Sequence, residues 1–228
     1  MSADVHGLSR ATIRRGIDGS LQRLGIDTVD LYYAHQDDPD TPLAETLGAF
    51  GELIGEGKIR HAAASNYSAV RLQEAVGIGQ GAGIASYVAL QPHYNLLERA
   101  QYEGELAGVC ARHGLACIPY FGLARGFLTG KYRRDGADVD SPRAAGVRKS
   151  YFNERGFAVL DALDQIAAAH DTSDAAVALA WLRVQPTVLA PIASATSPAQ
   201  LTELIASTQL ELSEQEIALL NARSASAA

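Results

Sequence analysis

Polar and aromatic side chains stand at the ends of four successive β-rich runs of the sequence. His35 closes the first run, Ser65-Asn66 the second, Gln91 the third and Tyr120 the fourth. In a parallel barrel the carboxyl ends of the strands meet at one mouth, where active sites lie. The spacing therefore favours a site at such a mouth, built from imidazole, hydroxyl, amide and aromatic groups.

Each of these residues also has an ordinary structural reading. A lone histidine at a strand end is more often structural than catalytic, and a Ser-Asn pair after a strand commonly caps a helix. The four positions favour a site only when they are taken together.

Two glycine-rich runs resemble phosphate-binding motifs but stand in the wrong context. The run over residues 77–83 follows a predicted helix and precedes a strand, whereas a pyrophosphate site needs the opposite order, so we predict a plain loop. The run from Gly126 to Lys131 is one residue short of a P-loop, and Tyr132 replaces the Ser or Thr that binds magnesium. This argues against a nucleoside triphosphate site.

The elements that would position the site alternate along the chain. Short β-rich runs are followed by longer stretches of helical periodicity, which is typical of a parallel sheet with crossover helices. The predicted strands cover residues 28–35, 59–65, 87–91, 115–120 and 187–193. The predicted helices cover residues 9–24, 41–56, 69–76, 102–113, 154–170, 173–184, 197–207 and 213–222, with Ser9 and Thr41 as N-caps.

One long segment, residues 121–151, carries little periodicity, which indicates a functional or disordered loop. No Pro/Ser-rich linker and no internal repeat divides the chain. We therefore predict a single domain over residues 1–228.

Composition and charge narrow the class of protein. The 228 residues carry 26 acidic and 19 basic side chains, a net charge of −7, which argues against nucleic acid or an anionic membrane as partner. No run approaches the roughly 18 apolar residues of a membrane span, and no signal peptide is visible. Cys110 and Cys117 are too few for a zinc set and are expected to be buried thiols of a reducing compartment. We predict a cytoplasmic protein without a metal site.

Several motifs match one known family in order along nearly the whole chain. They are Gly7-Leu-Ser-Arg10, Ser20-Leu-Gln-Arg-Leu-Gly25, Asp30-Leu-Tyr-Tyr-Ala-His35, Gly57-Lys-Ile-Arg60, Ser65-Asn66, Gln91-Pro-His-Tyr-Asn95, Leu123-Ala-Arg-Gly126, Leu128-Thr-Gly-Lys131, Ala180-Trp181 and Pro191-Ile192. With these motifs the sequence resembles the aldo-keto reductase family.

The resemblance implies an α/β fold of the (β/α)8 TIM-barrel type, of which this chain would supply about five strands, four to eight, with their helices. It also implies NADP(H) bound in extended form and reduction of aldehydes or ketones to alcohols. In the family, hydride passes from the nicotinamide to the carbonyl carbon. A tyrosine, whose pKa is lowered by a lysine that an aspartate holds, protonates the oxygen, and a histidine orients the substrate.

The resemblance assigns roles to the residues at the strand ends. His35 matches the substrate-orienting histidine, and Tyr120 matches the aromatic ring that stacks on the nicotinamide. The residues that match those holding the nicotinamide carboxamide are Ser65, Asn66 and Gln91.

Two later segments match the positions that hold the rest of the cofactor. The residues that match the loop over the pyrophosphate are Leu123, Gly126, Leu128 and Lys131. The residues that match the segment around the 2′-phosphate and the adenine are Ile192, Ala193, Ser194, Thr196, Ser197 and Gln200.

The catalytic Asp, Tyr and Lys of the family have no matching residue in this chain. All three would precede His35, yet the first lysine is Lys58. We therefore expect the 228-residue form to be inactive unless an N-terminal segment is supplied. Three explanations stay open: a truncated sequence, a natural short homologue, or strands supplied by a partner or by swapped copies. Tyr33 shares a strand face with His35, and is interpreted as a core residue rather than as a replacement acid.

Smaller departures bear on the cofactor. Thr196 stands where many members carry Arg or Lys, Leu204 where an adenine-contacting Asn often lies, and Phe121-Gly122 where Ser-Pro is usual. We predict NADP(H) in preference to NAD(H), and a small-molecule carbonyl substrate, with self-association left open. The alternative function is a non-catalytic nucleotide-binding or assembly module of the same fold.

Overall fold

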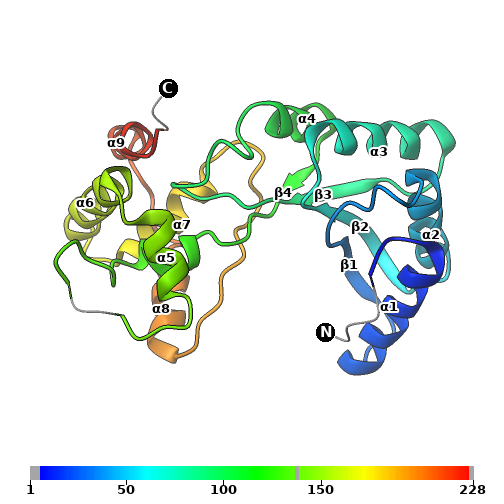
Figure 1. Ribbon diagram of the computed structural model, residues 1–228, viewed down its shortest axis with the longest axis horizontal. Helices are drawn as coiled ribbons and strands as arrows, with labels where there is room; N and C mark the ends of the chain where they lie inside the picture. Colours follow the sequence, from blue (N-terminus) through cyan, green and yellow to red (C-terminus); the bar gives the residue numbers. More distant parts are fainter. Residues whose placement is uncertain (1–5, 137–138, 226–228) are drawn as a thin grey trace. The chain divides into compact units, whose positions relative to one another are not determined.

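The computed structural model describes residues 6–136 and 139–225 (Figure 1). The chain divides into two compact units. The first comprises Met1–Pro92 and Glu105–Cys117, and the second comprises His93–Gly104 and Ile118–Ala228. A single domain over the whole chain stays a prediction.

The first unit alternates helices with parallel strands, as the sequence pattern predicts. Its elements are α1 (Arg10–Leu24), β1 (Val29–Ala34), α2 (Leu43–Gly55), β2 (Ile59–Ser65), α3 (Ala69–Ala82), β3 (Tyr87–Gln91), α4 (Glu105–His113) and β4 (Ala116–Cys117). The strands form one sheet in the order β1-β2-β3-β4, and every neighbouring pair is parallel. The carboxyl ends of these strands therefore share one edge of the sheet.

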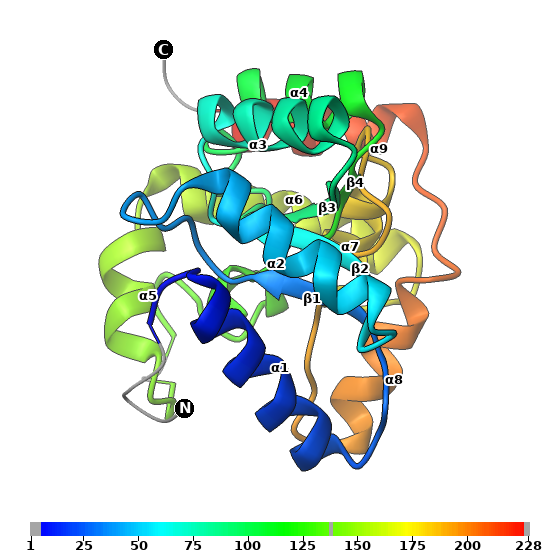
Figure 2. The same ribbon diagram turned by 90° about the vertical axis from the view of Figure 1, so that its right-hand side faces the viewer.

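The helices of the first unit form a layer along the sheet, each packed on the next. Figure 2 shows α2 across the front of β2, with α1 and α3 on either side of it. Phe50 of α2 is the centre of this interface, because its ring lies 6.1 Å from the rings of both Tyr32 and Tyr87. Cys110 and Cys117 are buried in the same unit, which confirms the prediction of two core thiols.

Two local predictions in this unit are wrong. Thr41 does not cap α2: its hydroxyl donates to Asp38, and the helix begins at Leu43. The glycine-rich run 77–83 is not a loop, because α3 continues through Ala82 and ends at Gly83. Packing explains the second error, since a side chain at Gly79 would meet the backbone oxygen of Ala85 at 2.8 Å. Glycine at position 79 lets α3 lie close to the segment that leads into β3. Ser9, in contrast, caps α1 as predicted.

The second unit is helical. Its elements are a short 3-10 helix η1 (Ala124–Thr129), α5 (Ala144–Tyr151), α6 (Glu154–Ala169), α7 (Asp174–Arg183), α8 (Pro198–Ala206) and α9 (Glu214–Ser224). The segment 121–151, predicted to be irregular, therefore holds two helical elements. Trp181 is the largest fully buried residue, and its indole nitrogen donates to the side-chain oxygen of Asn221 on α9 at 3.0 Å.

The described residues form four strands instead of the predicted five. Residues 187–193 do not form a strand: Pro191 has no N–H to donate, and the N–H of Ile192 donates to the carbonyl of Pro119 at 2.9 Å outside the sheet. The strand predicted over 115–120 is reduced to Ala116–Cys117, and Tyr120 forms an isolated bridge with His93. In the described part of the chain, no helix has both the length and the apolar composition needed to cross a bilayer.

Candidate functional site

A hydrogen-bonded network joins the predicted polar residues of the first unit. The Ser65 hydroxyl, at the end of β2, donates to the backbone oxygen of Gln91, at the end of β3, over 2.9 Å. The side-chain nitrogen of Asn66 donates to the Ser65 oxygen at 3.1 Å and to the backbone oxygen of His35 at 2.9 Å. Adjacent parallel strands thus bring together His35, Ser65, Asn66 and Gln91. Tyr120, the fifth residue predicted at the strand ends, follows β4 by three residues and belongs to the second unit.

The backbone at Asn66 is held in a left-handed conformation, with φ of 56°. This conformation costs a residue other than glycine about 1 kcal/mol or more, although asparagine tolerates it best. The two bonds donated by its amide offset that cost. Ser65 is buried, whereas His35 and Asn66 are exposed, so the network presents its outer members to solvent.

Tyr33 lies in the same network and is not the packed core residue that the sequence suggests. Its side chain is half-buried, and its hydroxyl hydrogen-bonds the Gln91 side chain. Burial raises the pKa of this hydroxyl, which makes it a weaker acid. Lys58 is the one lysine of the unit; it precedes β2 at the opposite end and pairs with Asp18 at 2.7 Å. Tyr33 therefore lacks the cation that an acid catalyst would need.

A stack of rings surrounds Tyr120 in the second unit. The imidazole of His93 lies parallel to the Tyr120 ring, with centroids 5.3 Å apart and planes 18° apart. Phe121 meets both rings edge to face. Burial lowers the pKa of His93, Glu98 opposes this effect and Arg125 adds to it, so the environment favours the neutral imidazole. His93 is a neighbour of the predicted site that the motif comparison did not assign.

The loop after Tyr120 has an unusual backbone. Phe121, Ala124 and Arg125 have φ of 55°, 47° and 58°, and Gly126 follows at 95°. The backbone N–H groups of Gly126 and Leu128 both donate to the carbonyl of Leu123, at 2.8 and 3.2 Å. Gly126 and Leu128 were matched to the pyrophosphate loop, but their backbone N–H groups are already bonded within the loop, and the Leu128 side chain is buried in the core.

Two exposed cations lie on this loop. The ammonium of Lys131 folds back over Gly126, where a side chain at position 126 would meet the lysine nitrogen at 3.3 Å. The guanidinium of Arg125 lies 5.1 Å from the centre of the Phe121 ring. The sequence predicts Lys131 as a residue of the pyrophosphate loop but does not single out Arg125. The available signal was its place inside the matched motif Leu123-Ala-Arg-Gly126.

The predicted adenosine segment lies at the start of α8. Ser197 caps this helix, and the side-chain oxygen of Gln200 accepts from both the backbone and the hydroxyl of Thr196, at 2.8 and 3.0 Å. Ile192, Ser194, Thr196, Ser197 and Gln200 are all exposed. Residues 192–200 contain no lysine or arginine, so hydroxyl groups and the helix terminus are the available partners for an anion.

The comparisons with known proteins identify the family. The model of the "Aldo/keto reductase family" matches residues 2–224. The chain belongs to the aldo/keto reductase family. Its fold is the (β/α)8 barrel type, and a solved thermostable aldo-keto reductase, Tm1743, in complex with the inhibitor epalrestat, superposes with a TM-score of 0.75. That match has 29% sequence identity and covers 95% of this chain and 67% of the other.

Curated aldo/keto reductase relatives differ in what their names describe. The NADH-specific methylglyoxal reductase of Escherichia coli K12 is 34% identical over 220 residues, which is 93% of this chain and 64% of that protein. A probable voltage-gated potassium channel subunit beta of Oryza sativa subsp. japonica is 33% identical over 201 residues, 86% of this chain and 61% of the subunit. This chain therefore spans somewhat less than two thirds of the length of these relatives.

Proposed function

We propose that this aldo/keto reductase chain binds a nicotinamide cofactor, NADP(H) in preference to NAD(H), for the reduction of an aldehyde or ketone. The observation that carries the proposal is the network of Ser65, Asn66 and Gln91. Their hydroxyl and amide groups are both donors and acceptors, as the amide group of a nicotinamide requires. The bound cofactor would supply the hydride.

Within the second unit by itself, the residues that the family resemblance matches to other parts of such a cofactor have suitable chemistry. Gly126 leaves room for the folded Lys131, and this cation with Arg125 would meet the two charges of a diphosphate. The flat ring of Tyr120, held from behind by His93, would stack on the nicotinamide. Ser197 and the start of α8 would hold the adenosine phosphate.

A binding measurement tests this proposal. Calorimetric titration of the purified chain with NADPH and with NADH should give one saturable site, with NADPH the tighter ligand. Tighter binding of NADH would reassign the cofactor. No saturable binding of either would overturn the proposal.

The proton-donor half of the reaction is tested separately, because no tyrosine–lysine pair matches the family motif in this chain. NADPH absorbance is followed with a generic aldehyde, for the 228-residue chain and for a version extended by any open reading frame upstream. We expect turnover from the extended version alone. His35 would then orient the carbonyl, and His35→Ala should lower kcat.

A non-catalytic nucleotide-binding or assembly subunit is the second candidate. The absence of matching catalytic residues and the similarity to a protein named as a channel subunit favour it. Saturable NADPH binding with no turnover from either version would select this candidate.

A further inference from the structure

The loop over residues 121–131, here termed the diphosphate loop, cannot hold its shape by local preference. Phe121, Ala124 and Arg125 all occupy the left-handed region. Each such residue costs roughly 1–3 kcal/mol and persists only where the surrounding structure fixes it. The contacts that hold the two ends of the loop therefore decide its conformation.

The start of the loop is fixed by packing. Asn95 donates its side-chain N–H to the carbonyl of Phe121 at 2.9 Å. Gly122 lies so close to α7 that an added side chain would meet Leu182 at 2.9 Å and Leu179 at 3.1 Å. These contacts are buried and insensitive to charge.

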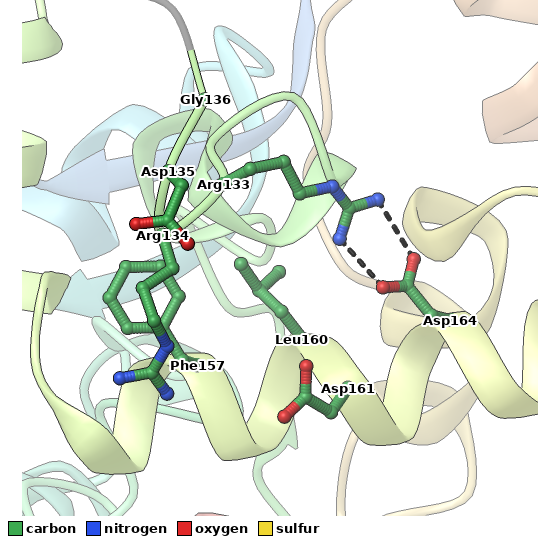
Figure 3. A pocket seen from close by; sticks show the side chains of 8 residues that line it. All are labelled: Arg133, Arg134, Asp135, Gly136, Phe157, Leu160, Asp161 and Asp164. Carbon is green, nitrogen blue, oxygen red and sulfur yellow. Dashed lines mark hydrogen bonds and ion pairs between the residues drawn. The ribbon is translucent and has the colours of Figure 1, made fainter.

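The end of the loop is held by charged groups instead. Arg133, two residues beyond Lys131, makes a two-pronged ion pair with Asp164 of α6 at 2.7 and 2.8 Å (Figure 3). Its guanidinium also lies 3.6 Å from the carboxylate of Asp174 of α7. Asp174 in turn abuts Gly130, where an added side chain would lie 2.1 Å from its carboxylate oxygen. One guanidinium thus links the end of the loop to two helices.

Asp174 depends on this cation. Its side chain is 8% exposed, and one carboxylate oxygen has no hydrogen-bond partner among the described residues. Burial and the nearby Asp164 carboxylate raise its pKa to about 6, whereas Arg133 opposes the rise. Asp161 is the remaining charged group that faces the same guanidinium. Without Arg133, the carboxylates of Asp164 and Asp174 would face each other uncompensated.

The ion pair between Arg133 and Asp164 contributes little to the global stability of the fold. The Arg133 and Asp164 side chains are 46% and 44% exposed, and pairs this exposed contribute about 0–1 kcal/mol. The pair nevertheless joins a strained loop to the helices. Its main effect is therefore to fix the position of the loop.

We propose that Arg133 is a positioning residue that holds the diphosphate loop, and with it Lys131, in the conformation that receives the cofactor diphosphate. This inference rests on the proposed function, since it concerns the same cofactor. Arg133 itself touches α6 and α7 and acts through the loop.

A matched neighbour makes the test sharp. Arg134 lies over Phe157 (Figure 3), is 51% exposed and pairs with Glu154 of α6 at 2.7 Å. Among the described residues, no ion pair joins Arg134 to Asp174. Arg133→Ala and Arg134→Ala therefore remove equal charge from adjacent, equally exposed positions. Arg133→Lys keeps the charge but loses the two-pronged geometry.

Two readouts are compared for these variants. In amide hydrogen exchange without cofactor, Arg133→Ala should accelerate exchange over residues 121–131, and Arg134→Ala should not. In NADPH titrations, Arg133→Ala should raise the Kd about fivefold through faster dissociation, because the loop must be ordered on binding, with Arg133→Lys intermediate. Melting temperatures are measured for both alanine variants, and the faster exchange in Arg133→Ala should be confined to the loop instead of following a general loss of stability.

The outcomes separate the two proposals. Identical exchange and identical Kd for Arg133→Ala and Arg134→Ala would overturn the role of Arg133, while leaving cofactor binding intact. Absence of NADPH binding by the unaltered chain would overturn the proposed function, and the exchange experiment would still decide whether Arg133 orders the loop.

Discussion

The two sets of candidate residues are held in place by different physics. In the first unit, Ser65, Asn66 and Gln91 stand at the ends of regular parallel strands and are joined by hydrogen bonds of 2.9–3.1 Å. In the second unit, the diphosphate loop departs from regular structure and is held by close glycine contacts and by Arg133. The first set owes its geometry to the sheet, and the second owes its geometry to packing between helices and a loop.

This difference predicts opposite responses to the same substitution at two helical glycines. Gly156→Ala in α6 would place a side-chain carbon 2.0 Å from the backbone oxygen of Tyr151, so it should lower the free energy of unfolding by about 3 kcal/mol or more. Gly77→Ala in α3 meets nothing within 4 Å and should raise stability by about 0.5–1 kcal/mol, because alanine is the better helix former. Urea unfolding followed by circular dichroism measures both. A tolerated Gly156→Ala would show that the second unit is packed less tightly than described.

The pH dependence of stability sharpens the comparison, since the buried carboxyl group lies in the second unit. The pKa of Asp174 is raised to about 6, so between about pH 4 and pH 6 the folded protein keeps a proton that the unfolded chain has lost. Its contribution to the free energy of unfolding therefore falls as pH rises through this window. In the unaltered protein this decrease in the free energy of unfolding should be about 2 kcal/mol, and Asp174→Asn should abolish it.

Urea titrations at pH 4.5 and pH 7 measure this effect. Asp164→Asn is the control, because it removes the neighbouring charge but leaves Asp174 buried, and it should remove less of the fall. An Asp174→Asn variant whose stability changes with pH as in the unaltered protein would show that this carboxyl group ionises normally.

Much of the first unit could be predicted from the sequence, because its order is local. The β-rich runs, the polar residues that close them and the cap at Ser9 all lie within a few positions of one another. The run 77–83 was misjudged because packing of Gly79 on Ala85 overrides the low helix propensity of glycine. The role proposed for Arg133 could not be predicted, since its partner Asp164 lies 31 residues away.

Removing the Ser65 hydroxyl tests the network of the first unit. Ser65→Ala leaves the partly buried backbone oxygen of Gln91 without this donor and Asn66 without one acceptor. We expect a loss of about 1–2 kcal/mol of stability, because unmade bonds to buried polar groups cost that much. Ser68→Ala, which removes the cap of α3, is the comparison for a hydroxyl outside the network. No loss of stability in Ser65→Ala would indicate that water replaces the hydroxyl.

The smallest expected effect concerns His93. His93→Phe keeps an aromatic ring behind Tyr120, whereas His93→Gln removes it. We expect His93→Gln to raise the Kd of NADPH about threefold and His93→Phe to leave it unchanged, since a ring stack contributes about 0.5–1.5 kcal/mol. Fluorescence titration measures both. An equal change in the two variants would assign the effect to the imidazole nitrogen atoms instead of the stack.

We propose that Ser65, Asn66 and Gln91 hold the nicotinamide end of the cofactor. The most direct test of this proposal is calorimetry of Gln91→Ala with two ligands, NADPH and adenosine 2′,5′-bisphosphate, which carries the adenosine phosphates but no nicotinamide. We expect an affinity about tenfold lower for NADPH and an unchanged affinity for the bisphosphate. An equal loss for both ligands, or no loss for either, would contradict it.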